Sequence, residues 1–477
     1  MWTATKPHYT IFTNMRASQS TMWAVVFGAT ALTALPQRRV VSLIIEGGTV
    51  VTVDREHRIF SPGSVAIDGN EIVDVDASHA IAERYQPSRV IDAREQIVLP
   101  GLVNTHTHAP MVMYRGLADD LTLMEWLEEY IFPAEAATVS PAFVRTGTRL
   151  ALVEMIESGT TTYADMYYFE EEVAAVTKAA GVRGVLGQTI IQFPVADAST
   201  PAEGLARAER FIKAFKNDEL IVPAVAPHAM YTLDAATLSA SADLGRRYGV
   251  PVLIHLAETQ DEARTSRARH GLSPTGYLES IGFWGPETIA AHGVWVDDYD
   301  VRVLRGHDVG VSHNPESNMK LASGAAPVAR YLAAGVALGL GTDGAASNND
   351  LDLFEAMRQA AFLAKHEAGD PTAMPARVAL ELATIGGARA LNLDSLIGSL
   401  EPGKRADLIA VSTDRARHVP LYDPVSHLVY VVHGDDVQSV VVNGKVLMHD
   451  RSLQTLDRGA VLAEARRLAE QVRASIR

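Results

Sequence analysis

Histidines and one aspartate that follow short apolar runs are the residues of this sequence best suited to chemistry. His106 and His108 stand two apart, directly after the apolar run GLV in GLVNTHTH. Side chains two apart share one face of a strand, so both imidazoles point the same way and form half of a metal site. His255 ends the run PVLIH, His292 ends TIAAH, and Asp343 follows VALGLGT. A buried carboxylate costs free energy unless it is paired or bound to a metal ion.

Each of these side chains alone also fits an ordinary structural role. The two histidines of HTH fit a surface or capping pair, His255 a core or loop histidine, and Asp343 a turn residue between glycines. Their joint order, with each group at the end of a separate apolar run, favours one divalent ion held by imidazole and carboxylate ligands. Glu258 follows His255 by three residues and can serve as a proton shuttle beside that ion.

A barrel of parallel strands would bring these residues together. Between Gly101 and about Asp394, eight short apolar runs alternate with helical stretches, which predicts an α/β fold of the (β/α)8 TIM-barrel type. Catalytic groups of this fold lie at the carboxyl ends of the strands. The runs end in polar or ionisable residues, namely His106, Asp165, Gln188, His228, His255, His292, His313 and Asp343.

A smaller β-sandwich domain is predicted from both ends of the chain. Short apolar runs joined by Gly, Asn and Asp turns occupy 43–98. The same pattern of apolar runs occurs in 406–412 and in 437–450, where Asn443-Gly444 provides the turn. The tail has apolar residues on one helix face, which predicts a helix that packs on the body. We therefore expect, in order, an N-terminal extension over 1–40, a first β-sandwich part over 41–97, the barrel over 98–394, a second β-sandwich part over 395–450 and a C-terminal helix over 451–477.

Charge and cysteine content exclude several classes of protein. The net charge is −15 and the pI is near 5.5, without a Lys/Arg cluster, so the chain lacks the basic face of a nucleic-acid or anionic-membrane binder. It has no cysteine, which excludes disulfides, thiolate nucleophiles, iron–sulfur clusters and cysteine-ligated zinc. We expect a small-molecule substrate, no nucleic acid and no stable membrane insertion, and homo-oligomers stay open.

The N-terminus carries one long apolar run, from Met22 to Leu35, which is too short to span a bilayer. Read from Met15, residues 15–31 fit a secretory signal that is cleaved after Ala31. The alternative is an extension that starts from a codon placed too far upstream. We expect a cytoplasmic protein, with export as the alternative if the signal is real.

Four longer motifs carry a family resemblance. They are IVLPGLVNTHTH around the histidine pair, SHNPESNMKLASGAAPV over 312–328, GTDGAASNND over 341–350, and ATIGGARALNL with IGSLEPGKRADLIAV over 383–411. With them, the chain from Leu43 to Asp450 resembles the amidohydrolase superfamily. Within that superfamily it looks like the branch of 5′-methylthioadenosine/S-adenosylhomocysteine deaminases, with triazine chlorohydrolases as close relatives.

The resemblance implies a metal centre and its chemistry. One divalent ion, Zn²⁺ or alternatively Fe²⁺, would be bound by His106, His108, His255 and Asp343. A bound divalent ion lowers the pKa of water from about 15.7 to about 7, which provides a nucleophile at neutral pH. Asp343 would take the proton of that water, with His292 beside it as an electrostatic and hydrogen-bonding partner. Glu258 would protonate a purine ring nitrogen and assist the departure of ammonia.

The implied activity is hydrolysis of a non-peptide carbon–nitrogen bond in a cyclic amidine, such as the adenine ring of a nucleoside. By the same resemblance Trp126 packs on the nucleoside, Glu135 holds ribose hydroxyls, His228 contacts the substrate and His313 shapes the pocket wall. The ordinary alternatives are an amphipathic helix anchor for Trp126 and a solvated helix residue for Glu135.

Gln188 marks a departure from the family pattern. Relatives that use S-adenosylhomocysteine carry an arginine for the amino-acid carboxylate, where this chain offers Gln188. A neutral amide does not replace a bidentate guanidinium–carboxylate pair. Methylthioadenosine, adenosine or another amino-heterocycle is therefore at least as well supported as a substrate. A triazine, pterin or guanine-like ring stays an alternative, as does a scaffold that has the fold without the chemistry.

Overall fold

The structure is a computed structural model that describes residues 38–475. From Arg38 onwards the chain forms one compact unit. The predicted extension over 1–40 lies outside the described residues except for its last positions, and the candidate signal over 15–31 lies wholly outside them. Over residues 38–475, no helix combines the length and the hydropathy that crossing a membrane requires.

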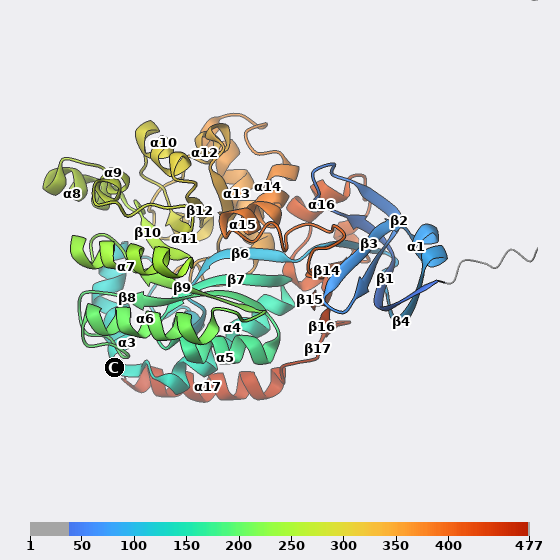
Figure 1. The fold of residues 1–477 in the computed structure, drawn as a ribbon, viewed down its shortest axis with the longest axis horizontal. Coiled ribbons are helices and arrows are strands. Elements are labelled where there is room, and N and C mark those ends of the chain that lie inside the picture. Colours follow the sequence, from blue (N-terminus) through green and yellow to red (C-terminus); the bar gives the residue numbers. More distant parts are fainter. Residues whose placement is uncertain (1–37, 476–477) are drawn as a thin grey trace, which may run out of the picture. The chain divides into compact units, whose positions relative to one another are not determined.

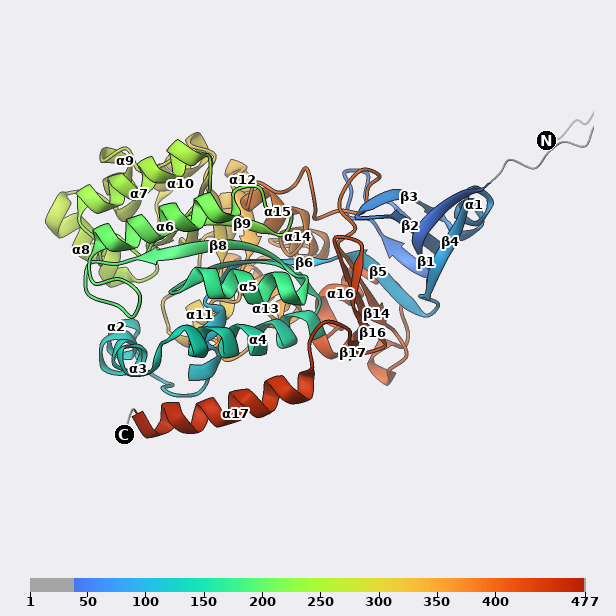
Figure 2. The same cartoon turned by 60° about the horizontal axis from the view of Figure 1, so that its bottom comes forward.

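Eight parallel strands close into a barrel, as the alternating apolar runs predict (Figure 1, Figure 2). Their order around the barrel is β10-β11-β12-β13-β6-β7-β8-β9. The strands are β6 (Leu102–Thr107), β7 (Thr160–Tyr167), β8 (Arg183–Ile190), β9 (Ile221–Pro227), β10 (Val252–Leu256), β11 (Thr288–His292), β12 (Gly310–His313) and β13 (Ala337–Leu340). The prediction of a (β/α)8 barrel is confirmed.

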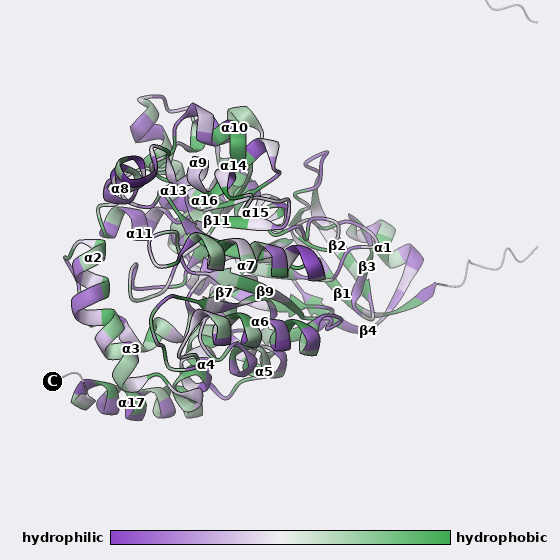
Figure 3. Ribbon diagram, turned by 60° about the vertical axis from the view of Figure 1, so that its left-hand side comes forward, coloured by the Kyte–Doolittle hydropathy of each residue, from purple (hydrophilic) through white to green (hydrophobic). Residues whose placement is uncertain are grey.

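The barrel strands are buried along almost their whole length, because side chains fill the interior and helices cover the outside. This burial on both faces explains why strands such as β10 (VLIHL) carry consecutive apolar residues instead of an alternating pattern. Figure 3 shows hydrophobic colour along β9, whereas hydrophilic and hydrophobic residues alternate along α17 (Arg458–Ser475). The helices between and after the strands are α4 (Pro141–Glu157), α5 (Glu170–Ala180), α6 (Pro201–Phe215), α7 (Ala235–Tyr248), α8 (Gln260–His270), α9 (Pro274–Ser280), α10 (Asp298–Gly306), α11 (Pro315–Lys320), α12 (Val328–Ala334), α13 (Leu353–Ala368), α14 (Ala376–Leu382) and α15 (Ile385–Ala390).

Both ends of the chain build one mixed sheet of nine strands. Strand β14 joins the two halves, since it pairs antiparallel with β5 and with β15. Buried residues of both halves, among them Ile45, Val98 and Val441, share one apolar core. A sheet domain assembled from both chain ends is therefore confirmed. Its strands are β1 (Arg39–Val51), β2 (Ile59–Asp68), β3 (Glu71–Ala77), β4 (Tyr85–Asp92), β5 (Gln96–Pro100), β14 (Leu408–Ser412), β15 (Val437–Val442), β16 (Lys445–His449) and β17 (Ser452–Leu453), with helices α1 (Ser78–Arg84) and α16 (Pro424–Tyr430) beside them.

The hairpin predicted at Asn443-Gly444 connects β15 and β16. The two residues have φ angles of 51° and 75°, and a type I′ turn requires positive φ at both central positions. Strand β5 crosses the boundary that the sequence suggests after residue 97. It does so because it pairs with β1 through Ile97 and Val98 and with β14 as far as Pro100.

A buried ion pair fastens the sheet to the start of strand β8. Arg183 donates from Nε to Oδ2 of Asp407 at 3.0 Å and from Nη2 to Oδ1 at 3.3 Å. Asp407 Oδ1 also accepts the N–H of Asn443 at 2.6 Å, and Arg183 Nη1 donates to the carbonyl of Glu219 at 2.9 Å. Both charged side chains are almost completely buried, so each charge needs the opposite charge of the other to offset the cost of its burial.

The connection after β6 contains an irregular helix that reaches over the carboxyl end of the barrel. It consists of the 3₁₀ turn Ala109–Tyr114, α2 (Leu123–Glu125), a π-helical turn over Trp126–Ile131 and α3 (Phe132–Thr138). π-Helical turns are rare and concentrate at functional sites.

The C-terminal helix α17 packs against α3 and α4. It buries Val461, Ala465 and Val472, which lie on the apolar face seen in the sequence. The helix begins at Arg458, because β17 occupies Ser452–Leu453 and residues 454–457 connect the two elements.

Candidate active site

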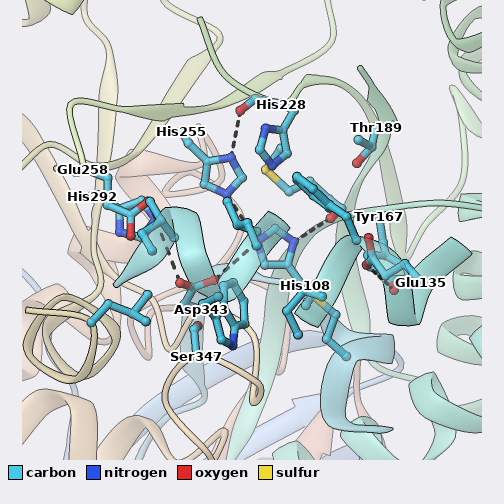
Figure 4. A pocket seen from close by; sticks show the side chains of 18 of the residues that line it. His108, Glu135, Tyr167, Thr189, His228, His255, Glu258, His292, Asp343 and Ser347 are labelled. Carbon is cyan, nitrogen blue, oxygen red and sulfur yellow. Dashed lines mark hydrogen bonds and ion pairs between the residues drawn. The ribbon is translucent and has the colours of Figure 1, made fainter. Parts of the chain in front are cut away.

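Four side chains from three strand ends converge on one point. Figure 4 shows three of them, His108, His255 and Asp343. His106 and His108 come from the end of β6, His255 from β10, and Asp343 follows β13. Nε2 of His255 lies 3.3 Å from Nε2 of His108. Oδ1 of Asp343 lies 3.3 Å from Nε2 of His108 and 3.4 Å from Nε2 of His106. The structure thus brings together the four residues that the sequence motifs mark as metal ligands.

Hydrogen bonds decide which ring nitrogens face that point. Nδ1 of His108 lies 2.7 Å from the carbonyl oxygen of Met166, and Nδ1 of His255 lies 2.8 Å from that of His228. A carbonyl oxygen only accepts, so each Nδ1 carries the proton and each neutral ring keeps a lone pair on Nε2. Two such lone pairs at 3.3 Å, beside a carboxylate oxygen, repel one another unless a cation lies among them. The donor set therefore fits a divalent metal ion.

Burial keeps these imidazoles in the neutral form that binds metal ions. It lowers the pKa of His106 to about 4 and lowers the pKa of His255 well below its ordinary value. Nε2 of His106 is also buried and makes no hydrogen bond to any group that the structure describes. An unpartnered buried nitrogen costs free energy, which coordination of an ion would offset.

Asp343 is held in place by its backbone and by its neighbours. Its φ angle is 65°, a conformation that non-glycine residues rarely adopt, and its N–H donates to the carbonyl of His106 at 3.0 Å. Oδ2 accepts the hydroxyl of Ser317 and Oδ1 accepts the N–H of Gly344, both at 2.7 Å. Burial acts to raise the pKa of Asp343, but the neighbouring histidines, His106 first among them, hold that pKa well below its usual value.

Glu258 and His292 lie together on one side of Asp343 (Figure 4). Nε2 of His292 is 3.7 Å from Oε2 of Glu258 and 4.0 Å from Oδ2 of Asp343, and its Nδ1 donates to Asn318 at 2.8 Å. Burial raises the pKa of Glu258. Burial opposes a charge on His292, but the carboxylates of Glu258 and Asp343 outweigh it and raise the pKa of His292. Glu258 can thus give or take a proton beside the metal-binding group.

Glu262 holds the backbone that presents Glu258. Its two carboxylate oxygens accept the N–H groups of Ala257 and Glu258, each at 2.9 Å. Ala257 has a φ angle of 47°, so this carboxylate stabilises a turn that an alanine rarely adopts. The side chain of Glu258 is held in addition by the hydroxyl of Ser323, which lies 3.3 Å from Oε1.

Trp126, Glu135 and His228 line the same cavity. Oε1 of Glu135 accepts the hydroxyl of Tyr167 at 2.7 Å, and this pair lies across the metal-binding group from Glu258 (Figure 4). Glu135 is buried, and burial raises its pKa to about 7. The cavity therefore combines a candidate metal-binding group, a carboxyl of raised pKa beside it and a second carboxyl at its far wall.

The sequence matches the model of the Amidohydrolase family over residues 97–447, which is most of the chain. The chain belongs to the amidohydrolase family. This amidohydrolase is 44% identical to the 5-methylthioadenosine/S-adenosylhomocysteine deaminase 1 of Syntrophus aciditrophicus (strain SB), over 92% of its own length and 99% of the relative.

Two solved structures resemble this amidohydrolase closely. An adenosine deaminase from Xanthomonas campestris with bound zinc superposes with a TM-score of 0.90 at 39% identity, over 92% of this chain and 100% of the other. An atrazine chlorohydrolase from Arthrobacter aurescens TC1 complexed with zinc gives a TM-score of 0.82 at 26% identity, over 90% of this chain and 100% of the other.

Two residues singled out from the sequence lie outside the cavity of this amidohydrolase. Gln188 is buried, and its Nε2 donates to Asp197 at 2.9 Å and to the carbonyl of Thr189 at 3.2 Å. Thr189 lines the cavity in its place, because successive side chains of a strand point to opposite faces. His313, at the end of β12, is buried and is not among the lining residues either.

Sequence reasoning missed other residues that shape the site. Strand β7 continues past Asp165 to Tyr167, and it is Tyr167 that reaches the cavity and holds Glu135. Asp165 instead accepts the hydroxyl of Thr107 at 2.7 Å and supports the loop of the histidine pair. Glu262 was also missed, although its place four residues after Glu258 puts it in the first turn of α8.

Proposed function

We propose that this amidohydrolase is a metal-dependent deaminase that hydrolyses the amino group of an adenine-type nucleoside and releases ammonia. One observation carries the proposal, which is that Asp343, Glu258 and Glu135 line the same cavity, with the metal-binding group between the two glutamates (Figure 4). Relatives named as deaminases of methylthioadenosine, S-adenosylhomocysteine or adenosine support the same substrate class.

Zinc is the ion that we propose for the site. Three imidazoles and one carboxylate are ligands that Zn²⁺ commonly takes, and both solved relatives named above hold zinc. Fe²⁺ accepts the same ligands and stays the alternative. When bound, such an ion supplies Lewis-acid activation that lowers the pKa of a water molecule from about 15.7 to about 7. The residues that would hold it are His106, His108, His255 and Asp343.

Asp343 and Glu258 move the protons of the reaction. Asp343 takes a proton from the attacking water, and Glu258 delivers one to the ring nitrogen beside the amino-bearing carbon. The water oxygen bonds to that carbon, and the proton taken by Asp343 passes to the amino group, which leaves as ammonia when the C–N bond breaks. The hydroxyl proton returns to Glu258 as the ring carbon becomes a carbonyl. The raised pKa of Glu258 suits a group that must be protonated near neutral pH. His292, 3.7 Å from Glu258, orients this carboxyl.

The far wall of the cavity would bind the sugar. An ionised Glu135 accepts two hydroxyl hydrogens well, and Tyr167 fixes its orientation through Oε1. Trp126 lies nine residues before Glu135 on the irregular helix and offers an apolar face for the nucleoside. His228 lines the cavity beside His255, with ring centroids 4.7 Å apart, and would contact the base.

The alternative substrate is an amino- or chloro-heterocycle without a sugar, such as a triazine, a pterin or a guanine-like ring. The likeness to an atrazine chlorohydrolase makes this class worth testing. A ring without hydroxyls would leave the buried carboxyl of Glu135 with Tyr167 as its hydrogen-bond partner, so Glu135 favours the nucleoside. The presence of all four candidate ligands and of Glu258 argues against a protein that has this fold but no catalytic activity.

Ammonia release from the zinc-loaded protein tests the proposal. The substrates to compare are adenosine, methylthioadenosine, free adenine, a pterin and a chlorotriazine. We expect release from the two nucleosides at a kcat/KM at least about 100-fold above that for free adenine, because the sugar contacts contribute binding energy in the transition state. Turnover of the pterin or triazine without turnover of a nucleoside would establish the alternative.

Glu258→Gln tests the assigned proton transfer. The variant should keep close to one metal ion per chain, since Glu258 is not a ligand, and should lose about 10²–10⁴-fold in kcat. Glu129→Gln, an exposed position on the π-helical turn, is the matched control and should behave as wild type. Near-normal turnover of Glu258→Gln would refute the role of this residue.

A further inference from the structure

A surface groove continues from the mouth of the catalytic cavity. Its apolar part is formed by Met124, Leu127, Phe132, Phe193 and Leu233, from the irregular helix and from the loops after β8 and β9. Met124 and Phe193 are 41% and 37% exposed, and exposed apolar side chains that gather in a groove mark a binding surface. The groove therefore offers apolar surface directly outside the reaction site.

The groove and the cavity share part of their walls. Leu127, Phe132 and Tyr231 line both of them. Phe132 and Phe193 meet edge to face across the groove, with ring centroids 5.1 Å apart. Phe132 and Glu135 stand three apart on α3 and so share a helix face. A sugar bound at Glu135 would therefore lie next to this aromatic pair.

The charged groups at the groove are acidic. Glu128, on the π-helical turn, and Asp234, at the start of α7, contribute the two carboxylates. Oδ1 of Asp234 accepts the N–H of Thr237 at 2.8 Å, and this hydrogen bond lowers the pKa of Asp234, so it is ionised at neutral pH. Among the residues that the structure describes, neither the groove nor the cavity is lined by a lysine or an arginine.

We propose that this groove binds the 5′ substituent of the nucleoside, and that it selects neutral apolar substituents such as methylthio over substituents that end in a carboxylate. The inference rests on the proposed nucleoside deaminase function and narrows its substrate. Apolar walls bind a thioalkyl group by removing it from water. An amino-acid carboxylate would lose its hydration without gaining a cationic partner, and it would face Glu128 and Asp234.

A series of 5′-substituted adenosines tests the selection with the zinc-loaded protein. We expect kcat/KM for methylthioadenosine to exceed that for 5′-deoxyadenosine by about tenfold and that for S-adenosylhomocysteine by about 100-fold. Equal values for methylthioadenosine and S-adenosylhomocysteine would overturn the inference and leave the deaminase proposal standing. A failure to release ammonia from adenosine itself would remove the deaminase proposal, and the inference with it.

Two charge-reversal variants distinguish an effect of charge at the groove from an effect of the net charge of the protein. Glu128→Lys places a cation at the groove, whereas Glu129→Lys makes the same change one residue along, where Glu129 lines a different depression beside Tyr130. We expect Glu128→Lys to raise the ratio of kcat/KM for S-adenosylhomocysteine over methylthioadenosine by about tenfold, and Glu129→Lys to leave that ratio unchanged. Equal changes in both variants would show that the groove does not hold the substituent.

Phe193→Ala tests the apolar wall without changing charge. Removal of the ring should lower kcat/KM for methylthioadenosine by about tenfold more than for 5′-deoxyadenosine, since only the former carries the larger substituent. A general folding defect would lower both values by the same factor. Equal losses for the two substrates in a variant with wild-type metal content would contradict the assignment.

Discussion

The N–H of Glu258 donates to Oε2 of Glu262 at 2.9 Å. Oε1 of Glu262 takes the preceding N–H, that of Ala257, at the same distance. Glu262 is buried, and burial raises its pKa to about 7, but the two backbone donors favour its ionised form. Both oxygens of the Glu262 carboxylate therefore hold the backbone that positions Glu258, the group that we assign to proton transfer.

Glu262→Gln should lower kcat by about 10²-fold while KM and metal content stay near wild type. A glutamine accepts through one oxygen only, and its NH₂ group would face a second N–H, so the turn at Ala257 loses its support and Glu258 is misplaced. Steady-state kinetics with metal analysis measures this split between kcat and KM. Asp261→Asn, an exposed carboxylate on the same turn of α8, is the control. A parallel loss in both variants, or loss of the metal ion from Glu262→Gln, would contradict the positioning role.

Removal of the metal ion should lower stability as well as activity. Without a cation, the lone pairs of His108 and His255 face each other at 3.3 Å. An ion that binds only the folded chain stabilises it by about 2.7 kcal/mol at a concentration ~100 times its Kd. Dialysis against a chelator should therefore lower the thermal midpoint, and added Zn²⁺ should restore both midpoint and turnover. An apoprotein with unchanged midpoint and turnover would contradict the metal site.

Glu135 should make stability depend on pH. Its pKa in the folded chain is about 7, above its ordinary value of 4.5. Between these values the folded chain binds this proton more tightly than the unfolded chain, so its contribution to the free energy of unfolding falls as pH rises, and it is constant above about pH 7. Glu135→Gln removes this titration. The free energy of unfolding of the variant, relative to that of the wild type, should therefore increase from pH ~4.5 to ~7. Urea denaturation across that window measures the difference, with Glu129→Gln as control, and a difference that does not vary with pH would contradict the raised pKa.

The ion pair between Arg183 and Asp407 should be essential for stability. Asp407→Ala leaves a buried guanidinium without its partner, and we expect the free energy of unfolding to fall by about 3–5 kcal/mol. Asp243→Ala removes an exposed pair with Arg246 and should change it by less than about 1 kcal/mol. Urea denaturation of both variants provides the comparison. Equal effects would mean that the buried pair is not what fastens the sheet to the barrel.

The barrel, and the grouping of the candidate metal ligands at one edge of it, could be predicted from the sequence. Eight buried strands leave eight apolar runs, and the fold places their carboxyl ends at one edge, so His106, His255 and Asp343 could be grouped without coordinates. The two-residue spacing of His106 and His108 likewise places both on one strand face. These features follow from the spacing of residues along the chain and from the general rule that the strands of a (β/α)8 barrel end at one edge. Neither requires knowledge of the tertiary contacts of this protein.

The tertiary structure alone decided which neighbours act on those residues. The sequence pattern of strand β8 does not show whether Gln188 or Thr189 points into the cavity. In the structure Gln188 donates to Asp197, and Thr189 lines the cavity. Glu135 is a buried carboxyl whose Oε1 accepts the hydroxyl of Tyr167, a residue of a different strand end. Such outcomes depend on burial and hydrogen bonds between segments far apart in the chain, and the free energies that decide them arise only once those segments pack together.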